Sequence, residues 1–181
     1  TIDSLKAVTV AANAENIYVL PNNSNILMAA SQACEIVSEG DVNCYVIPSK
    51  SIIQGITSAI MFNPEESPEE NFREMKSALK NVKTGEVTFA IRDTEINGLS
   101  IKKDDFMGIS GKEIIFNGLD KFDIARKLIE YMVDEESSII TIFVGEDVTE
   151  EEQKSFAKEI RTTYDDFDID IRKGNQPVYS F

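Results

Sequence analysis

The side chains that could do chemistry in this 181-residue sequence are mostly carboxylates, with 32 Asp and Glu against 18 Lys and Arg and no histidine. Without histidine there can be no Ser-His-Asp or Cys-His nucleophile, no histidine base and no histidine metal ligand. Carboxylate, lysine or metal-assisted chemistry remains, as does binding of a basic protein surface. The formal charge of −14 argues against nucleic acid and anionic membranes as partners.

The excess of acid is concentrated in one part of the sequence. Residues 1–84 carry ten acids and six bases, net −4, whereas residues 85–181 carry twenty-two acids and twelve bases, net −10. Residues 134–170 alone hold thirteen acids and three bases, also net −10. Solubility alone could explain an even surplus. A local surplus favours a surface that binds a basic partner.

Two acidic runs follow predicted helices, whose C-termini repel negative charge, so capping does not explain them. If the strands after these helices run parallel, both loops lie at one edge of the sheet. Four further acids are candidates, although local pairing and turn formation could explain the pair at 93 and 95. The predicted partner-binding residues are Glu65, Glu66, Asp93, Glu95, Asp134, Glu135, Glu136, Asp165 and Asp166.

One strand-to-helix loop could bind an anion. Lys50, with the hydroxyls of Ser49 and Ser51, could hold a carboxylate or phosphate at a helix N-terminus. Plain helix capping is the favoured alternative. The sequence has no Walker A motif and no glycine-rich phosphate loop.

The two cysteines, Cys34 and Cys44, fall in a helical and a strand pattern and lack CxxC or CxxH neighbours. A metal site is therefore not suggested. We expect two separate buried thiols in a reducing cytosol. No apolar run long enough to span a bilayer and no signal peptide is visible, so we expect a cytoplasmic protein.

The first half of the chain alternates helical and strand patterns, and its short apolar strands suit a parallel sheet covered by helices. Helix N-caps are expected at Ser24 or Asn25 and at Ser67, where Glu70 would complete a capping box. Gly40 is expected to end the first of these helices. Residues 1–14 fit a helix or, around residues 7–10, a strand, and the helix is favoured. The other predicted elements are strands at 16–20 and 42–47, and helices that begin near residues 24, 51 and 67.

The second half has the pattern of a mixed α/β sandwich. Its first strand alternates so that Val87, Phe89 and Ile91 share the buried face, and Asp120 and Thr149 are expected to cap two helices. The strands are expected at 86–92, 138–144 and 167–172, with a hairpin at 105–117 that turns at Ser110-Gly111. We predict an α/β protein of two small α/β subdomains, 1–84 with a parallel sheet and 85–181 with a mixed α/β sandwich.

A series of short motifs runs in order through nearly the whole chain: Val19-Leu20-Pro21-Asn22-Asn23-Ser24-Asn25, Val46-Ile47-Pro48-Ser49-Lys50-Ser51-Ile52, Gln54-Gly55, Phe62-Asn63-Pro64, Asn81-Val82-Lys83-Thr84-Gly85, Arg92-Asp93-Thr94-Glu95-Ile96, Asp105-Phe106-Met107-Gly108-Ile109, Gly145-Glu146-Asp147-Val148 and Gln176-Pro177-Val178-Tyr179. Together they resemble the carboxy-terminal region of the kinase subunit of bacterial fatty acid kinase.

The resemblance implies a kinase subunit whose amino-terminal domain, similar to dihydroxyacetone kinases, binds ATP and magnesium. A central domain would supply dimerisation and catalytic residues, and both lie outside this chain. For this region the resemblance implies two subdomains similar to the fold of the enzyme's fatty acid-binding subunit. It also implies an acidic groove that receives a basic surface of that partner. No cofactor and no metal is expected here.

We therefore predict a non-catalytic docking domain that binds the fatty acid-binding subunit, so that kinase domains of the full chain can phosphorylate the bound fatty acid. The product would be acyl phosphate for phospholipid synthesis. Other domains of its own full-length chain are also expected partners, and nucleic acid and membrane insertion are not. The alternatives are a module that binds a small molecule, either a fatty acid or an anion, and an enzyme with a carboxylate or metal site.

Overall fold

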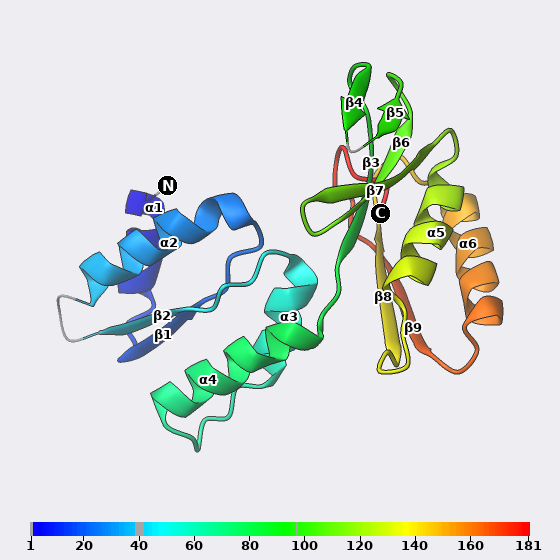
Figure 1. Cartoon of the computed structure of the whole chain (residues 1–181). Helices are drawn as coiled ribbons and strands as arrows, with labels where there is room; N and C mark the ends of the chain where they lie inside the picture. Colours follow the sequence, from blue (N-terminus) through cyan, green and yellow to red (C-terminus); the bar gives the residue numbers. More distant parts are fainter. Residues whose placement is uncertain (1, 39–41, 97) are drawn as a thin grey trace. The chain divides into compact units, whose positions relative to one another are not determined.

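Short strands and capped helices alternate along the chain and give a mixed α/β fold with small sheets (Figure 1). The structure is a computed structural model that describes residues 2–38, 42–96 and 98–181. The chain divides into Thr1–Val82, called unit 1, and Lys83–Phe181, called unit 2. The domain boundary predicted after Thr84 lies close to this division, and the two-domain organisation itself stays a prediction.

Unit 1 is built around two parallel strands, as the short apolar strands indicated. They pair in register from Asn16 with Asn43 to Val19 with Val46. The elements of unit 1 are α1 (Ile2–Ala11), β1 (Asn16–Val19), α2 (Ser24–Val37), β2 (Asn43–Val46), α3 (Ile52–Ile60), α4 (Pro68–Ala78) and the 3₁₀ helix η1 (Leu79–Asn81).

The two faces of this strand pair carry different side chains. Tyr18 and Tyr45 are register partners, and their rings stack with centroids 5.2 Å apart. Phe62 and Phe72, which flank the start of α4 in the sequence, pack against this aromatic pair. The opposite face carries Ile17 and its register partner Cys44. Unit 1 thus holds its strands between an aromatic cluster and helix α2.

The helix ends in unit 1 differ in detail from the sequence expectations. The N-cap of α2 is Asn23, one residue earlier than expected, because its extended backbone lets the side-chain oxygen accept from the Asn25 N–H at 2.8 Å. The helix ends at Val37, and Gly40 lies outside the described residues. Ser67 caps α4 as predicted. Glu70 binds Arg73 instead of closing a capping box.

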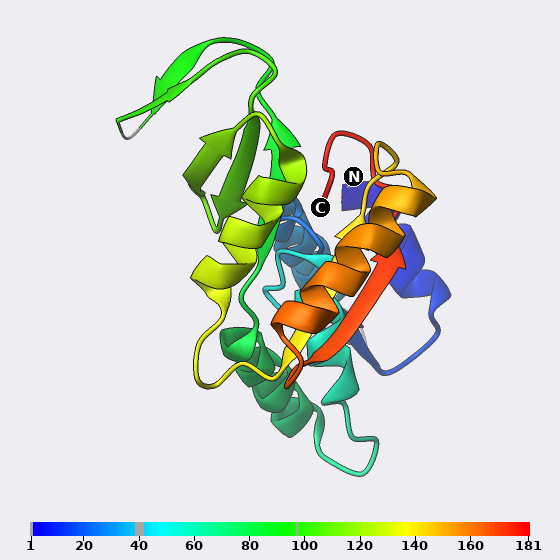
Figure 2. The same cartoon turned by 90° about the vertical axis from the view of Figure 1, so that its right-hand side faces the viewer.

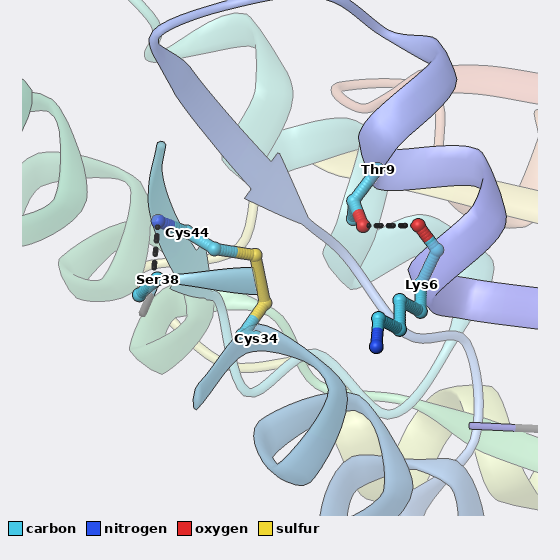
Figure 3. The surroundings of a disulfide bond; sticks show 5 residues. All are labelled: Lys6, Thr9, Cys34, Ser38 and Cys44. Atoms are coloured by element: carbon cyan, nitrogen blue, oxygen red, sulfur yellow. Dashed lines mark hydrogen bonds between the residues drawn. A yellow bond between two sulfur atoms is a disulfide. The ribbon is translucent and has the colours of Figure 1, made fainter. Parts of the chain in front are cut away.

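The cysteines are joined, which corrects the expectation of two separate thiols. Cys34 on α2 and Cys44 on β2 form a disulfide, with Cα atoms 5.1 Å apart (Figure 3). The sequence placed each cysteine on the correct type of element. It gave no distance between the helix and the strand, and a disulfide is decided by that distance.

Unit 2 combines a three-stranded antiparallel sheet, a hairpin and a parallel strand pair with two helices. The order of the larger sheet is β3-β6-β7, and β8 pairs with β9 in parallel. The elements are β3 (Gly85–Phe89), β4 (Thr94–Ile96), β5 (Leu99–Ile101), β6 (Phe106–Ser110), β7 (Glu113–Gly118), α5 (Lys121–Met132), β8 (Ile139–Val144), α6 (Glu150–Thr163) and β9 (Asp168–Lys173). Asp120 caps α5 and Thr149 caps α6 through a complete capping box, as predicted.

The hairpin formed by β4 and β5 was not predicted, and it projects from the rest of unit 2 in Figures 1 and 2. The run predicted as one strand to residue 92 ends at Phe89. Phe89 and Ile91 are exposed, and Thr88 is buried instead. The reason is that Thr88 forms a β-bridge to Tyr179 and donates its hydroxyl to the Val178 carbonyl at 2.8 Å.

Helix α5 packs closely on the three-stranded sheet because glycines face it. A Cβ atom added at Gly85 would lie 2.6 Å from Leu128 Cδ2, and one at Gly108 would lie 2.9 Å from Ile124 Cγ2. Ile124 and Leu128 are buried, and they join Phe156 of α6 in the main core of unit 2. Both helices therefore rest on the strands through one shared core, and they lie next to each other in Figure 2.

The last residues of the chain connect β3 with the end of β8. Ser180 N–H donates to the Val87 carbonyl at 2.8 Å, and Gly145 N–H donates to the Ser180 carbonyl at 2.9 Å. The Gln176 side chain donates to the Phe143 carbonyl at 3.0 Å. This main chain fits only because residue 145 has no side chain, since a Cβ there would lie 2.0 Å from the Tyr179 carbonyl oxygen.

We expect Gly145→Ala to lower the free energy of unfolding by about 1–3 kcal/mol, because the obstructing atom belongs to the backbone and cannot move away cheaply. Urea unfolding followed by circular dichroism measures this. Gly118→Ala is the control, since its Cβ would lie 3.4 Å from the flexible Ile124 side chain. A Gly145→Ala protein as stable as the Gly118→Ala protein would contradict this account.

Candidate docking surface

The parallel pairing of β8 and β9 places the loops before both strands at one end of the pair (Figure 1). Ile139 is the register partner of Asp168, and the Asp168 N–H donates to the Ser138 carbonyl at 2.9 Å. The two strands therefore run parallel, as the prediction that both acidic loops lie at one edge of the sheet required. The exposed carboxylates of these two loops, here called the β8–β9 acidic surface, are Asp134, Glu135, Glu136, Asp165 and Asp166.

Asp134 has a structural role within this surface. Its carboxylate accepts from the Ser137 hydroxyl at 2.8 Å and from the Glu136 N–H at 3.2 Å, which fixes the turn after α5. It also pairs with Lys83, whose ammonium in addition donates to the Met132 carbonyl at 3.0 Å. The Lys83 hydrogen bond is the main reason why the pKa of Asp134 lies below its ordinary value.

The other four carboxylates are not neutralised by neighbours. Within the ranges that the structure describes, no ion pair includes Glu135, Glu136, Asp165 or Asp166. Four like charges on two adjacent loops repel one another, and a cationic partner would relieve this repulsion. The arrangement is therefore suited to binding a positively charged surface.

An apolar side chain is exposed where one of the acidic loops ends and β8 begins. Ile139 is the first residue of β8 and is 64% exposed, next to the exposed Asp168 on β9. Interfaces commonly combine an apolar centre with a polar rim. Sequence reasoning missed Ile139 because it lies on an apolar β-branched strand, a pattern that normally indicates burial.

Glu65 and Glu66 form a separate acidic turn in unit 1. Asn63 Oδ1 accepts from the Glu65 N–H at 3.1 Å, and buried Asn71 donates its amide to the Glu66 carbonyl at 3.3 Å. These bonds use only the main chain of the two glutamates, so both carboxylates remain exposed. Asn71 organises this turn, and sequence reasoning did not single it out, because asparagine in a helix gives no periodic signal.

Asp93 and Glu95 lie on the projecting hairpin and differ in role. The Asp93 carboxylate accepts from the Lys103 N–H at 2.8 Å and from Lys102 Nζ at 3.4 Å. The Lys103 hydrogen bond in particular lowers the pKa of Asp93. Asp93 thus braces the base of the hairpin, while Glu95 is exposed opposite Ser100.

The Ser49-Lys50-Ser51 loop uses both of its hydroxyls to satisfy the chain itself. The buried Ser49 hydroxyl donates to the Pro21 carbonyl at 2.6 Å. Ser51 is the N-cap of α3 and accepts from the Gln54 N–H at 3.2 Å. The exposed Lys50 ammonium could still bind a ligand. Helix capping accounts for this loop, and anion binding there stays a prediction.

Surface hollows, clusters of metal-binding side chains and apolar helices could indicate other kinds of site. A hollow of about 410 Å³ in unit 2 is lined by Phe116, Lys127, Glu130 and Tyr131. Within residues 2–38, 42–96 and 98–181, no three carboxylates or thiols gather as metal ligands would. None of the helices that the structure describes has the length and apolar composition needed to cross a bilayer.

Comparison with known proteins gives a family for the whole chain. A sequence model of the C-terminal domain of FakA-like fatty acid kinase subunits matches residues 1–181. Protein YloV of Bacillus subtilis is 41% identical over 180 residues, which are 99% of this chain and 31% of that protein. An uncharacterized protein of Staphylococcus epidermidis is 37% identical over 181 residues, 100% of this chain and 32% of that protein. The chain thus spans about a third of the length of these relatives.

A solved structure shares the fold at low sequence identity. It is the fatty acid kinase B3 protein of Streptococcus pneumoniae loaded with linoleic acid, with a TM-score of 0.65 and 15% identity. The match covers 98% of this chain and 69% of that protein. The predicted similarity to the fold of the fatty acid-binding subunit is confirmed.

The Lys83–Asp134 pair should be visible in an acid titration. Because the pKa of the Asp134 carboxyl is lower in the folded protein, the pair stabilises the fold at pH values above 3.8, the ordinary pKa of this group. That contribution is lost as the pH falls through the lower, folded pKa. We expect Lys83→Gln to raise the Asp134 midpoint toward 3.8 in a carboxyl NMR titration. Lys112→Gln, at an exposed turn, should not change it. Equal Asp134 midpoints in both variants would show that Lys83 does not set this pKa.

Proposed function

Because this chain belongs to the FakA-like C-terminal family of fatty acid kinase, we propose that it is the docking domain of such a kinase. In this proposal it binds the fatty acid-binding subunit of the enzyme and has no catalytic role of its own. The observation that carries the proposal is the β8–β9 acidic surface, where four exposed carboxylates have no cationic partner among the residues described.

Exposed negative charge and an exposed apolar side chain support a protein as the ligand. Exposed carboxylates steer a basic surface toward the loops, and the exposed Ile139 side chain offers apolar contact once the partner has arrived. Glu95 is a further exposed acid of unit 2, and Glu65 and Glu66 are a separate pair of exposed acids of unit 1. Asp93 and Asp134 hold their turns in place and contribute less to binding.

Docking would serve a kinase through effective concentration. A bound carrier keeps its fatty acid near the catalytic domains of the same long chain, which turns a bimolecular encounter into a local one. ATP and magnesium would bind those other domains, and the product would be an acyl phosphate for phospholipid synthesis. The proposed location is the cytoplasm.

A second candidate function is binding of a fatty acid by this chain itself. The observation in its favour is that the structurally similar protein of Streptococcus pneumoniae is loaded with linoleic acid. Against it, two hollows of the described units, of about 410 and 290 Å³, carry charged side chains in their linings. Neither lining is the long apolar tunnel that an acyl chain requires.

We expect the double variant Glu135→Lys/Glu136→Lys to weaken binding to the purified fatty acid-binding subunit roughly tenfold or more at low salt, because the reversed charges repel a basic surface. Titration calorimetry at low and high salt measures this loss. Wild-type affinity should fall as salt rises. The affinity of the variant should change less with salt than that of the wild type.

The matched control is Glu146→Lys/Glu151→Lys, which changes the net charge equally near the opposite end of β8. This control should keep close to wild-type affinity. Equal losses of affinity in the two double variants would indicate an effect of net charge alone. Unchanged affinity in both variants would show that the acidic surface is not part of the interface.

We expect the isolated chain to turn over no ATP, with or without added magnesium, and to carry no lipid after incubation with fatty acid. A coupled ATPase assay and native mass spectrometry test the two expectations. The fatty acid-binding subunit, treated identically, is the positive control for lipid. Recovery of stoichiometric fatty acid from this chain would establish the second candidate function instead.

A further inference from the structure

The disulfide adds a covalent bond between two elements of unit 1, helix α2 and strand β2, that also pack against each other. Cys34 is 4% exposed and lies on the buried face of α2, with Ala30, Ala33 and Val37. Its partner, Cys44, is on β2, whose described ladder partner is β1. Figure 3 shows the sulfur–sulfur bond passing directly from the helix to the strand. A single covalent link therefore ties α2 to the sheet.

The part of unit 1 whose burial the structure describes contains few large apolar side chains that could hold these elements without that link. Among those described side chains, the buried apolar ones other than alanine and cysteine are Ile17, Val37, Ile47 and Met75. Unit 2 buries a larger cluster drawn from α5, α6, β3 and β8. Small units with thin cores usually depend on a disulfide, a metal or a partner for stability.

Apolar side chains that could have enlarged this core are exposed. Ile52, Ile56 and Ile60 lie along one side of α3 and are 56%, 48% and 76% exposed. The side of α3 that meets α4 carries Ser58 instead, which donates its hydroxyl to the Met75 carbonyl at 2.7 Å. The contact between α3 and α4 thus adds a hydrogen bond where a core would place a large apolar side chain.

We propose that Cys34 and Cys44 form a reversible thiol–disulfide couple that controls the stability of unit 1 and leaves unit 2 unaffected. Oxidation joins the two sulfurs as two thiols lose two electrons and two protons to a low-molecular-weight disulfide, which is cleaved to two thiols. Reduction by a dithiol reverses the step and forms that reductant's own disulfide. The hydrogen bond from the Cys44 N–H to the Ser38 hydroxyl, 3.2 Å long, does not involve sulfur, so its donor and acceptor are the same in both states.

The size of the effect follows from the loop that the bond closes. The cysteines are ten residues apart. Restricting a loop of this length in the unfolded chain shifts the opening equilibrium by on the order of 100-fold. Because both cysteines lie in unit 1, α2 and β2 should open more often after reduction. The helices of unit 2 should keep their protection from hydrogen exchange.

The test is hydrogen–deuterium exchange of the 181-residue chain after oxidation with glutathione disulfide and after reduction with dithiothreitol, with thiols counted in each sample. We expect no titratable thiol in the first sample and two in the second. Exchange in α2 and β2 should rise on the order of 100-fold on reduction. Exchange in α5 and α6 should stay the same.

The variant Cys34→Ala/Cys44→Ala is the matched control, because it cannot form the link. It should exchange like the reduced wild type under both conditions. Two thiols that remain titratable after glutathione disulfide would overturn the proposal. It would also be overturned by identical exchange in the oxidised and reduced wild type, or by an equal rise in both units.

Discussion

The parallel pairing of β8 with β9 is the constraint on which the proposed surface depends. Two parallel neighbours must be joined by a crossover, and α6 provides it by carrying the chain from the end of β8 back to the start of β9. The loop after α5 and the loop after α6 therefore arrive at the same end of the strands. An antiparallel pair would have placed these loops at opposite ends and dispersed their carboxylates.

Close main-chain packing in unit 2 keeps that arrangement in place. Gly85 and Gly108 let α5 approach the three-stranded sheet, and Gly145 leaves room for the final residues of the chain. The final residues of the chain hydrogen-bond to β3 on one side and to Gly145, just after β8, on the other. All three glycines belong to the motifs that resemble the family, so several of these motifs specify packing of the scaffold that presents the acidic loops.

Much of the fold was predictable because the strongest signals are local. Apolar periodicity and capping residues such as Ser67, Asp120 and Thr149 depend only on nearby sequence, and the structure has them where expected. The buried Thr88 and the disulfide depend on distant segments that meet only after folding. The hairpin at β4 and β5 was missed because strands of three residues are too short to show alternation.

For the candidate site, the sequence could count carboxylates but could not say which ones have partners. The carboxylates of Asp93 and Asp134 bind turn residues and lysines, whereas no ion pair of the described residues includes Glu135. NMR can show whether the unpaired acids beside Ile139 bind a basic partner. In a titration of the labelled chain with the unlabelled fatty acid-binding subunit, we expect the largest amide shifts at residues 134–139 and 164–168. Saturable binding that left those amides unshifted would contradict this expectation.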